Sequence, residues 1–189
     1  MKNIVKQSLL NHRKVLESLD LLQGQIEETA VIFLDTLRQG GKIIFVGNGG
    51  SAADAQHLAA EFTGRFKMNR PPLAALALST NTSSLTAIGN DFGFDSVFSR
   101  QIEALAKSED VIVAISTSGN SENVIKAVEA ARKHGIKTVG FLGKDGGKLK
   151  NLVDLALVIS SDEAARIQEM HILMGHIVCE ITETFFFNS

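Results

Sequence analysis

Residues 43–55 read IIFVGNGGSAADA, a run of four large apolar residues followed by a glycine-rich turn and small helix-forming residues. A short apolar run without polar alternation is typical of a strand buried on both faces of a sheet. The turn Gly47–Ser51 opens the next helix, where free N–H groups and the positive end of the helix dipole favour an anion. This strand–turn–helix unit predicts an α/β fold with a ligand site at the turn.

The rest of the chain repeats this alternation of apolar strands and helices. Strands are expected at Ile43–Val46, Ala74–Leu78, Val111–Ile115, Thr138–Leu142 and Leu155–Ile159. Helices are expected at Ser51–Phe66, Thr82–Ile88, Ser121–His134, a short piece near Lys148, and Glu163–Phe186. This order predicts a doubly wound, five-stranded parallel sheet in a flavodoxin-like three-layer α/β sandwich. Ligands of such sheets bind beyond the carboxyl ends of the strands, so the loops after the strands are the candidate site.

The N-terminal segment is expected to be helical. Apolar residues recur at steps of three and four between residues 2 and 39, which predicts two helices broken near Gly24. Gly40 and Gly41 would then end the second helix as a C-cap. We therefore divide the chain into an N-terminal helical extension, residues 1–40, and an α/β domain, residues 41–189, within one folding unit.

The overall composition excludes several classes of protein. Nineteen Lys and Arg against 21 Asp and Glu give a net charge of −2, without the basic field that a nucleic-acid or membrane-surface binder needs. The single cysteine, Cys179, excludes an internal disulfide and fits a reducing compartment. The sequence shows no signal peptide and no apolar run near the ~20 residues of a membrane span. We expect a cytoplasmic protein with neither a nucleic-acid nor a membrane partner.

The loop after the third strand also opens a helix. Residues 116–121 read STSGNS and offer four hydroxyls, on Ser116, Thr117, Ser118 and Ser121. An ordinary N-cap needs a single hydroxyl, for which Ser121 is best placed. Because the other three exceed that need, we interpret the loop as a phosphate site built from neutral donors at a helix N-terminus.

The glycine-rich loops do not fit a nucleotide site. Gly47, Gly49 and Ala52 match the dinucleotide pattern G-x-G-x-x-G/A, but residues 78–80 read LST where that pattern expects an acidic residue. The stretch GKDGGK at residues 143–148 resembles a Walker A turn but is followed by Leu149 instead of Ser or Thr, which favours a simple turn. A phosphorylated sugar, with no nucleotide cofactor, fits these loops better.

Two helices carry candidate acid, base and metal-ligand side chains. His57 and Glu61 are four residues apart and share a helix face among apolar neighbours, which favours a functional pair over a solvent-exposed one. Gln168 and His176 lie on the last helix, roughly 80° apart in projection, so both can face one cleft. That helix is apolar nearly all round, and a lone histidine there is more often a core residue. Spacing alone therefore leaves His176, and a zinc site made of these four side chains, undecided.

Seven motifs in a fixed order carry a family resemblance. They read GNGGSAADAQH (47–57), GRF (64–66), RP (70–71), GNDFG (89–93), STSGNS (116–121), GKDGG (143–147) and RIQEMH (166–171). Together they resemble the phosphoheptose isomerases, bacterial members of the sugar isomerase (SIS) family, over essentially the whole chain. The resemblance implies an SIS-type fold and the conversion of sedoheptulose 7-phosphate to D-glycero-D-manno-heptose 7-phosphate through an enediol. That reaction is the first step toward the ADP- and GDP-heptose precursors of surface polysaccharides.

The resemblance also implies roles for individual residues. The implied substrate-binding residues are Asn48, Gly49, Gly50, Ser51, Glu61, Asn90, Asp91, Ser116, Thr117, Ser118, Ser121 and Gln168, the hydroxyls holding the phosphate. Glu61 and His176 match the acid/base pair, since a carboxylate suits the carbon-bound proton and an imidazole suits the oxygens. Zinc, one ion per subunit, is implied at His57, Glu61, Gln168 and His176.

Relatives of this kind form homotetramers with sites between subunits, and residues 1–40 are expected to serve that assembly. The alternative is a non-catalytic SIS module that binds the bacterial replication initiator. Such modules share the RIQEMH segment but match poorly at the acid/base pair, whereas this chain keeps Glu61 and His176, and its Gly50 and Ser118 follow the isomerase pattern. One departure is Ala165, which stands where some isomerases carry an acid, so a supporting hydrogen bond is expected to be missing there.

Overall fold

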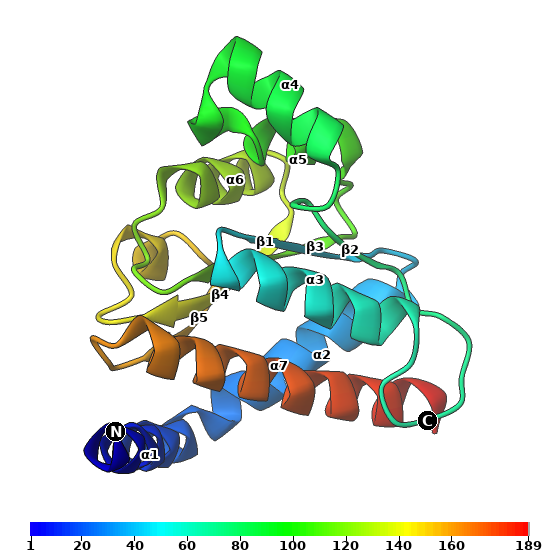
Figure 1. The fold of residues 1–189 in the computed structure, drawn as a ribbon. Helices are drawn as coiled ribbons and strands as arrows, with labels where there is room; N and C mark the ends of the chain where they lie inside the picture. The colour runs from blue at the N-terminus through cyan, green and yellow to red at the C-terminus, as the bar shows by residue number, and fades with distance from the viewer. Residues whose placement is uncertain (189) are drawn as a thin grey trace.

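The structure, a computed structural model, describes residues 1–188. Within these residues, five parallel strands form one sheet between two layers of helices (Figure 1). The strands are β1 (Ile43–Gly47), β2 (Ala75–Ala77), β3 (Val111–Ser116), β4 (Lys137–Gly143) and β5 (Leu155–Ile159). Each lies within one residue of a strand predicted from an apolar run. The doubly wound parallel α/β fold is therefore confirmed.

The helices lie on both faces of the sheet. They are α1 (Lys2–Leu16), α2 (Gln23–Arg38), α3 (Gly50–Thr63), α4 (Thr82–Phe92), α5 (Ser99–Leu105), α6 (Glu122–Lys133) and α7 (Ala164–Phe187), with 3₁₀ segments η1 (Glu17–Leu22), η2 (Phe94–Ser96) and η3 (Lys148–Asn151). Figure 1 shows α2, α3 and α7 on one face and α4, α5 and α6 on the other. Among the described helices, none has the length and apolar character needed to cross a membrane.

The strand order places two loops side by side. The order is β2-β1-β3-β4-β5, so β1 and β3 are neighbours and the connections from them run to opposite sides. Gly47 at the end of β1 is in register with Ile115 near the end of β3. A ligand of a doubly wound sheet binds at such a switch point, beyond the carboxyl ends of the two strands. Two loops that lie far apart in the sequence meet there. They are residues 47–51, called here the glycine-rich loop, and residues 116–121, called here the serine-rich loop.

The alternation of side chains in β1 builds a core on each side of the sheet. Ile43 and Phe45 pack with α2, α3 and α7, whereas Ile44 and Val46 pack with α5 and α6. All four side chains are buried, as expected for a central strand of a doubly wound sheet. On the first face, the ring of Phe45 lies 6.2 Å from that of Phe33 in α2 and 6.4 Å from that of Phe62 in α3. These contacts hold α3 firmly on the sheet.

The break between the two N-terminal helices does not lie at Gly24, so that prediction was wrong. Gly24 is inside α2, and the break is the 3₁₀ segment η1, Glu17–Leu22. The hydroxyl of Ser18 donates to the carbonyl of Val15 at 2.6 Å, a local bond that competes with the helical pattern. Leu19 is turned into the core by this segment. Burial of an apolar side chain, rather than glycine flexibility, sets the break.

The end of α2 confirms the predicted C-cap. Gly40 has a φ of 79°, a left-handed conformation that glycine adopts without strain. The N–H of Gly41 then donates to the carbonyl of Thr36 at 2.9 Å, which satisfies one of the last helical carbonyls. A Cβ on Gly41 would lie 2.2 Å from the carbonyl oxygen of Glu109. The two backbone segments are therefore too close at this position for any side chain to fit.

Two other helix predictions need correction. The helix expected to run to Phe66 ends at Thr63, because the N–H groups of Phe66 and Lys67 donate to the Glu183 carboxylate instead of continuing the helix. The helix expected to end at Ile88 continues to Phe92. Helix α5 was not predicted, because it is too short to show helical periodicity and is held by packing on α6.

His171 of α7 is fully buried and gives the fold a testable pH dependence. Burial lowers the pKa of His171 to about 4, although the nearby backbone of Leu142 favours the protonated form. An unfolded histidine has a pKa near 6.5, so the folded chain binds this proton less readily than the unfolded chain. The free energy of unfolding should therefore fall as pH drops through 6.5 and stop falling near pH 4.

Comparison with a His171→Leu variant isolates this contribution. Between pH 7 and pH 5 we expect the wild-type chain to lose about 2 kcal/mol of unfolding free energy that the variant does not lose. Urea unfolding monitored by circular dichroism at several pH values measures the difference. Parallel pH curves for the two proteins would show that His171 titrates normally in the fold.

Candidate active site

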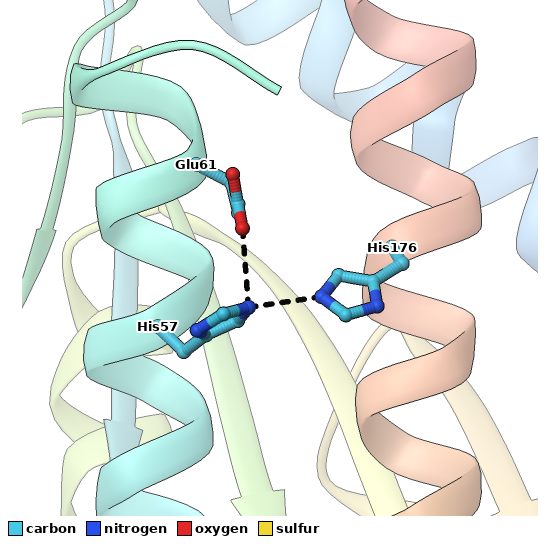
Figure 2. A group of neighbouring side chains, drawn as sticks. All are labelled: His57, Glu61 and His176. Atoms are coloured by element: carbon cyan, nitrogen blue, oxygen red, sulfur yellow. Dashed lines mark hydrogen bonds and ion pairs between the residues drawn. The ribbon is translucent and has the colours of Figure 1, made fainter. Parts of the chain in front are cut away.

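Three titratable side chains meet between α3 and α7. His57 and Glu61 project from α3 and His176 from α7, and the three side chains point toward one another (Figure 2). Nε2 of His57 lies 2.9 Å from Nε2 of His176 and 3.1 Å from Oε1 of Glu61. The four-residue spacing on α3 predicted the His57–Glu61 pair. The structure adds His176, which spacing alone left undecided.

The close approach of α3 and α7 makes this cluster possible. A Cβ on Gly175 would lie 2.5 Å from Cδ2 of Leu58, so glycine lets the two helices pack tightly one residue away from both histidines. The ring of Phe66, just beyond α3, stacks on the ring of His176 with centroids 5.5 Å apart and planes 29° from parallel. The imidazole of His176 is therefore oriented from two sides, by Phe66 and by His57.

The environment of His176 keeps its imidazole neutral at neutral pH. Burial lowers the pKa of His176, the nearby His57 lowers it further, and the Glu61 carboxylate opposes both. A neutral imidazole offers a lone pair that accepts a proton or binds a metal ion. The site therefore places a proton acceptor beside a carboxylate.

The same three side chains fit a divalent metal ion. Their ligand atoms all lie within 4.8 Å of one another. A tetrahedral zinc site with bonds of about 2.0–2.1 Å separates its ligand atoms by roughly 3.3 Å. The distances from Nε2 of His57, 2.9 and 3.1 Å, are close to that value. Two imidazoles and one carboxylate are also ligand types that zinc accepts.

The serine-rich loop gathers its hydroxyls at the end of β3. Oγ of Ser116 lies 3.3 Å from Oγ of Ser121 and 3.5 Å from Oγ of Ser118. Ser121 occupies the N-cap position of α6, yet among residues 1–188 it makes no side-chain capping hydrogen bond. The N-cap interpretation thus does not account for this hydroxyl, which leaves it available to an anion at the helix N-terminus.

The turn at residues 143–147 packs directly against the serine-rich loop. Gly119 has a φ of 65°, and a Cβ there would lie 1.9 Å from the carbonyl oxygen of Gly146. Oδ1 of Asn120 accepts from the backbone N–H of Lys148 at 3.0 Å, and its Nδ2 donates to the carbonyl of Ser118 at 2.9 Å. The segment is a turn, as predicted, and it also holds the serine-rich loop in shape.

A reciprocal pair of amides joins the two loops. Nδ2 of Asn48 donates to Oδ1 of Asn123 at 2.8 Å, and Nδ2 of Asn123 donates back to Oδ1 of Asn48 at 2.9 Å. Asn48 belongs to the glycine-rich loop, and Asn123 lies buried in the first turn of α6. This pair sets the spacing between the N-termini of α3 and α6, so both helix ends face the same region.

Known proteins are similar to this chain in sequence and in fold. A model of the SIS domain matches residues 10–143. The phosphoheptose isomerase of a Helicobacter pylori strain is 52% identical over 185 residues, which are 97% of this chain and 96% of that protein. The phosphoheptose isomerase of a Nitratiruptor species is 52% identical over 183 residues, 96% of this chain and 98% of that protein. The chain belongs to the phosphoheptose isomerase family.

Solved structures of phosphoheptose isomerases superpose on nearly the whole chain. The enzyme from Neisseria gonorrhoeae has a TM-score of 0.92 at 44% identity and covers 97% of this chain and 98% of its own. The enzyme from Francisella tularensis has a TM-score of 0.93 at 35% identity and covers 96% of this chain and 97% of its own. The SIS-type fold and the family resemblance are thereby confirmed.

Three motif residues of this phosphoheptose isomerase family member lie away from the cluster. The Gln168 side chain lies against Gly50, where a Cβ would come within 2.2 Å of its Nε2. Its Cα is about 12 Å along α7 from that of His176, because the two are eight residues apart. Asn90 and Asp91 lie exposed near the end of α4, across the sheet from α3 and α7, with Nδ2 of Asn90 donating to Asp91 at 2.8 Å (Figure 1).

Several residues that shape the site were not among those predicted from the sequence. Phe66 orients His176, Asn123 links the two loops, and Asn120 holds the serine-rich loop. Asn123 had a detectable signal, since it is a polar residue on the face of α6 that carries the buried Ala127 and Ala130. Phe66 and Asn120 had none, because His176 and the backbone N–H of Lys148, with which they interact, come from distant parts of the chain.

Proposed function

We propose that the chain isomerises sedoheptulose 7-phosphate to D-glycero-D-manno-heptose 7-phosphate through an enediol. The observation that carries the proposal is the His57–Glu61–His176 cluster, a carboxylate and a neutral imidazole brought together in a chain of the phosphoheptose isomerase family. An aldose–ketose isomerase needs one group for the carbon-bound proton and another for the oxygen-bound proton. The product would supply nucleotide-activated heptose for lipopolysaccharide or capsule.

We assign the phosphate to the N-terminus of α6 and the sugar to the neighbouring loop. The proposed phosphate ligands are Ser51, Ser116, Thr117, Ser118 and Ser121. The proposed sugar contacts are Asn48, Gly49, Gly50, Glu61, Asn90, Asp91 and Gln168. The grouped hydroxyls, the uncapped helix end and the Asn48–Asn123 link support this division.

Proton transfer follows from the two side chains. Glu61 removes a proton from C1 of the ketose, and the electron pair of that bond forms the C1–C2 double bond of the enediol. The same carboxylic acid returns the proton to C2, which yields the aldose. His176 moves a proton between the oxygens on C1 and C2, a role that its lowered pKa supports.

We further propose that His57, Glu61 and His176 hold one zinc ion per subunit, with Gln168 as the fourth ligand. The spacing of the first three ligand atoms supports the ion, and no nucleotide cofactor is proposed. To take part, Gln168 would have to leave Gly50 and extend along α7. Zinc would supply Lewis-acid polarisation of the substrate oxygens.

We propose a cytoplasmic homotetramer with active sites at subunit interfaces. Helix α1 has no buried residue among its described side chains, and Ile4, Val5 and Leu9 are 72, 61 and 55% exposed. Such a row of apolar side chains fits a subunit interface, which supports a role of residues 1–40 in assembly. Asn90 and Asp91 lie on the far face of the sheet, so a neighbouring subunit is needed for them to serve a site at α3 and α7.

The alternative, a non-catalytic SIS module that binds the replication initiator, is not favoured. The relatives at about half identity over the full chain are phosphoheptose isomerases. Glu61 and His176 are both present and adjacent to His57. A retained acid and base are what catalysis requires and partner binding does not.

Removal of the metal tests the proposal. We expect purified protein to convert sedoheptulose 7-phosphate to the aldose, to lose about 100-fold in kcat after chelation and dialysis, and to recover with one equivalent of zinc. Full activity in metal-free protein would contradict the zinc assignment. No turnover in any condition would contradict the isomerase, and a pull-down with the replication initiator would then test the alternative.

A further inference from the structure

A buried ion pair joins the segment after α3 to α7, the two helices that carry His57, Glu61 and His176. Nε of Arg70 donates to Oε2 of Glu183 at 2.7 Å, and both side chains are only 2% exposed. Arg70 lies in the segment after α3, and Glu183 lies on α7, two helical turns beyond His176. The pair therefore connects the end of the helix that carries Glu61 to the helix that carries His176.

Arg70 completes the C-terminus of α3. The last carbonyls of a helix lack helical partners, and Arg70 supplies donors for two of them. Its Nη2 donates to the carbonyl of Glu61 at 2.8 Å, and its Nη1 donates to the carbonyl of Phe62 at 2.9 Å. A cation at this end of the helix also interacts favourably with the helix dipole. The backbone of Glu61 is thus held by the guanidinium.

Glu183 holds the segment that follows α3. Its carboxylate accepts from the backbone N–H groups of Phe66, Lys67 and Met68 at 3.0, 2.8 and 2.6 Å, besides the bond from Arg70. Burial alone would raise the pKa of Glu183, but these three N–H groups and Arg70 hold it below its ordinary value. The carboxylate therefore stays charged at neutral pH. It fixes Phe66, whose ring stacks on His176.

We propose that Glu183 and Arg70 are positioning residues, which hold Glu61 and His176 at the separation that metal binding and proton transfer require. The inference rests on the function proposed above. Arg70 acts on Glu61 through its carbonyl, and Glu183 acts on His176 through Phe66. Neither side chain touches the three ligand atoms. Loosening the pair would let α3 and α7 shift while the serine-rich loop, which lies on other elements, keeps its shape.

A second buried carboxylate provides a matched control. Asp110 is 2% exposed, pairs with Nζ of Lys42 and accepts from the backbone N–H groups of Lys42 and Lys107. It lies just before β3, at the amino edge of the sheet, opposite the site. Asp110→Asn therefore removes the same kind of charge from the same kind of environment without disturbing α3 or α7.

Zinc affinity and kinetics of three variants test the inference. For Glu183→Gln and Arg70→Lys we expect zinc affinity, measured by chelator competition on metal-free protein, to fall about 10- to 100-fold. We expect kcat to fall by a similar factor of about 10 to 100, with KM within about threefold. Asp110→Asn should lower the melting temperature comparably while zinc affinity and kcat stay within about twofold of wild type. If Glu183→Gln does not fold, Arg70→Lys still tests the inference.

The outcomes separate this inference from the proposed function. If Glu183→Gln and Arg70→Lys match Asp110→Asn in zinc affinity and kcat, the pair is merely structural and the inference is overturned. A wild-type chain that binds no zinc also overturns it. If the variants lose zinc affinity while the wild type binds zinc but does not isomerise sedoheptulose 7-phosphate, the proposed function fails and the positioning role stands.

Discussion

A Glu61→Gln variant is expected to fold and to lose about 10³-fold in kcat for sedoheptulose 7-phosphate. The amide has the shape of the carboxylate, and its oxygen can still lie near Nε2 of His57, as Oε1 of Glu61 does at 3.1 Å. It cannot, however, accept the proton from C1 of the ketose. The measurement is the rate of aldose formation, together with deuterium uptake from solvent at C1, which reports proton removal even when the overall reaction is incomplete.

The control for this variant is another histidine–carboxylate pair. Oε2 of Glu169 lies 2.7 Å from Nδ1 of His12, in a contact between α1 and α7. Glu169→Gln removes the same charge from a similar pair away from the cluster, so we expect kcat within about twofold of wild type. A folded Glu61→Gln protein that retains near-normal turnover and deuterium uptake would refute the assigned role of Glu61.

A Ser121→Ala variant is expected to raise KM for the phosphorylated substrate about 10- to 100-fold with little change in kcat. A hydrogen bond to a charged group contributes about 1.5–3 kcal/mol, which corresponds to this range. The phosphate is held equally in substrate and transition state, so its loss affects KM rather than kcat. Because Ser121 makes no side-chain capping bond within the described chain, the fold should be little affected.

Two controls accompany this variant: a serine substitution far from the site and a substrate that lacks the phosphate. Ser108→Ala removes a hydroxyl before β3, at the opposite edge of the sheet from the serine-rich loop, and should leave KM unchanged. Free sedoheptulose, which lacks the phosphate, should be turned over equally poorly by wild type and Ser121→Ala. An unchanged KM for the phosphorylated sugar in Ser121→Ala would place the phosphate elsewhere.

The parallel sheet could be predicted from the sequence because each strand is an apolar or nearly apolar run, and most of these runs are bounded by glycine or polar residues. In β1, residues that face opposite cores alternate, yet all are apolar since both faces are covered. Helices were less predictable at their ends. The end of α3 is set by Glu183, which lies more than a hundred residues away and takes the N–H groups of Phe66 and Lys67.

The candidate site was predictable in parts. Glycines after β1 and serines after β3 each indicate an anion site at a helix N-terminus, and the spacing of His57 and Glu61 indicates a shared helix face. Helical periodicity could not separate His176 from a core histidine, because every turn of α7 carries apolar residues. The tight passage of α7 across α3 at Gly175 brings its ring to His57.

By itself, the sequence determined the fold class, the two loops at the carboxyl edge of the sheet and the chemistry that their residue types can perform. These features are local, since strand, turn and helix cap each depend on neighbouring residues. Only the tertiary structure decided which distant groups meet: Asn48 with Asn123, His57 with His176, and Arg70 with Glu183. Such pairs depend on how helices pack across the sheet, and packing is fixed by the whole core rather than by any one segment.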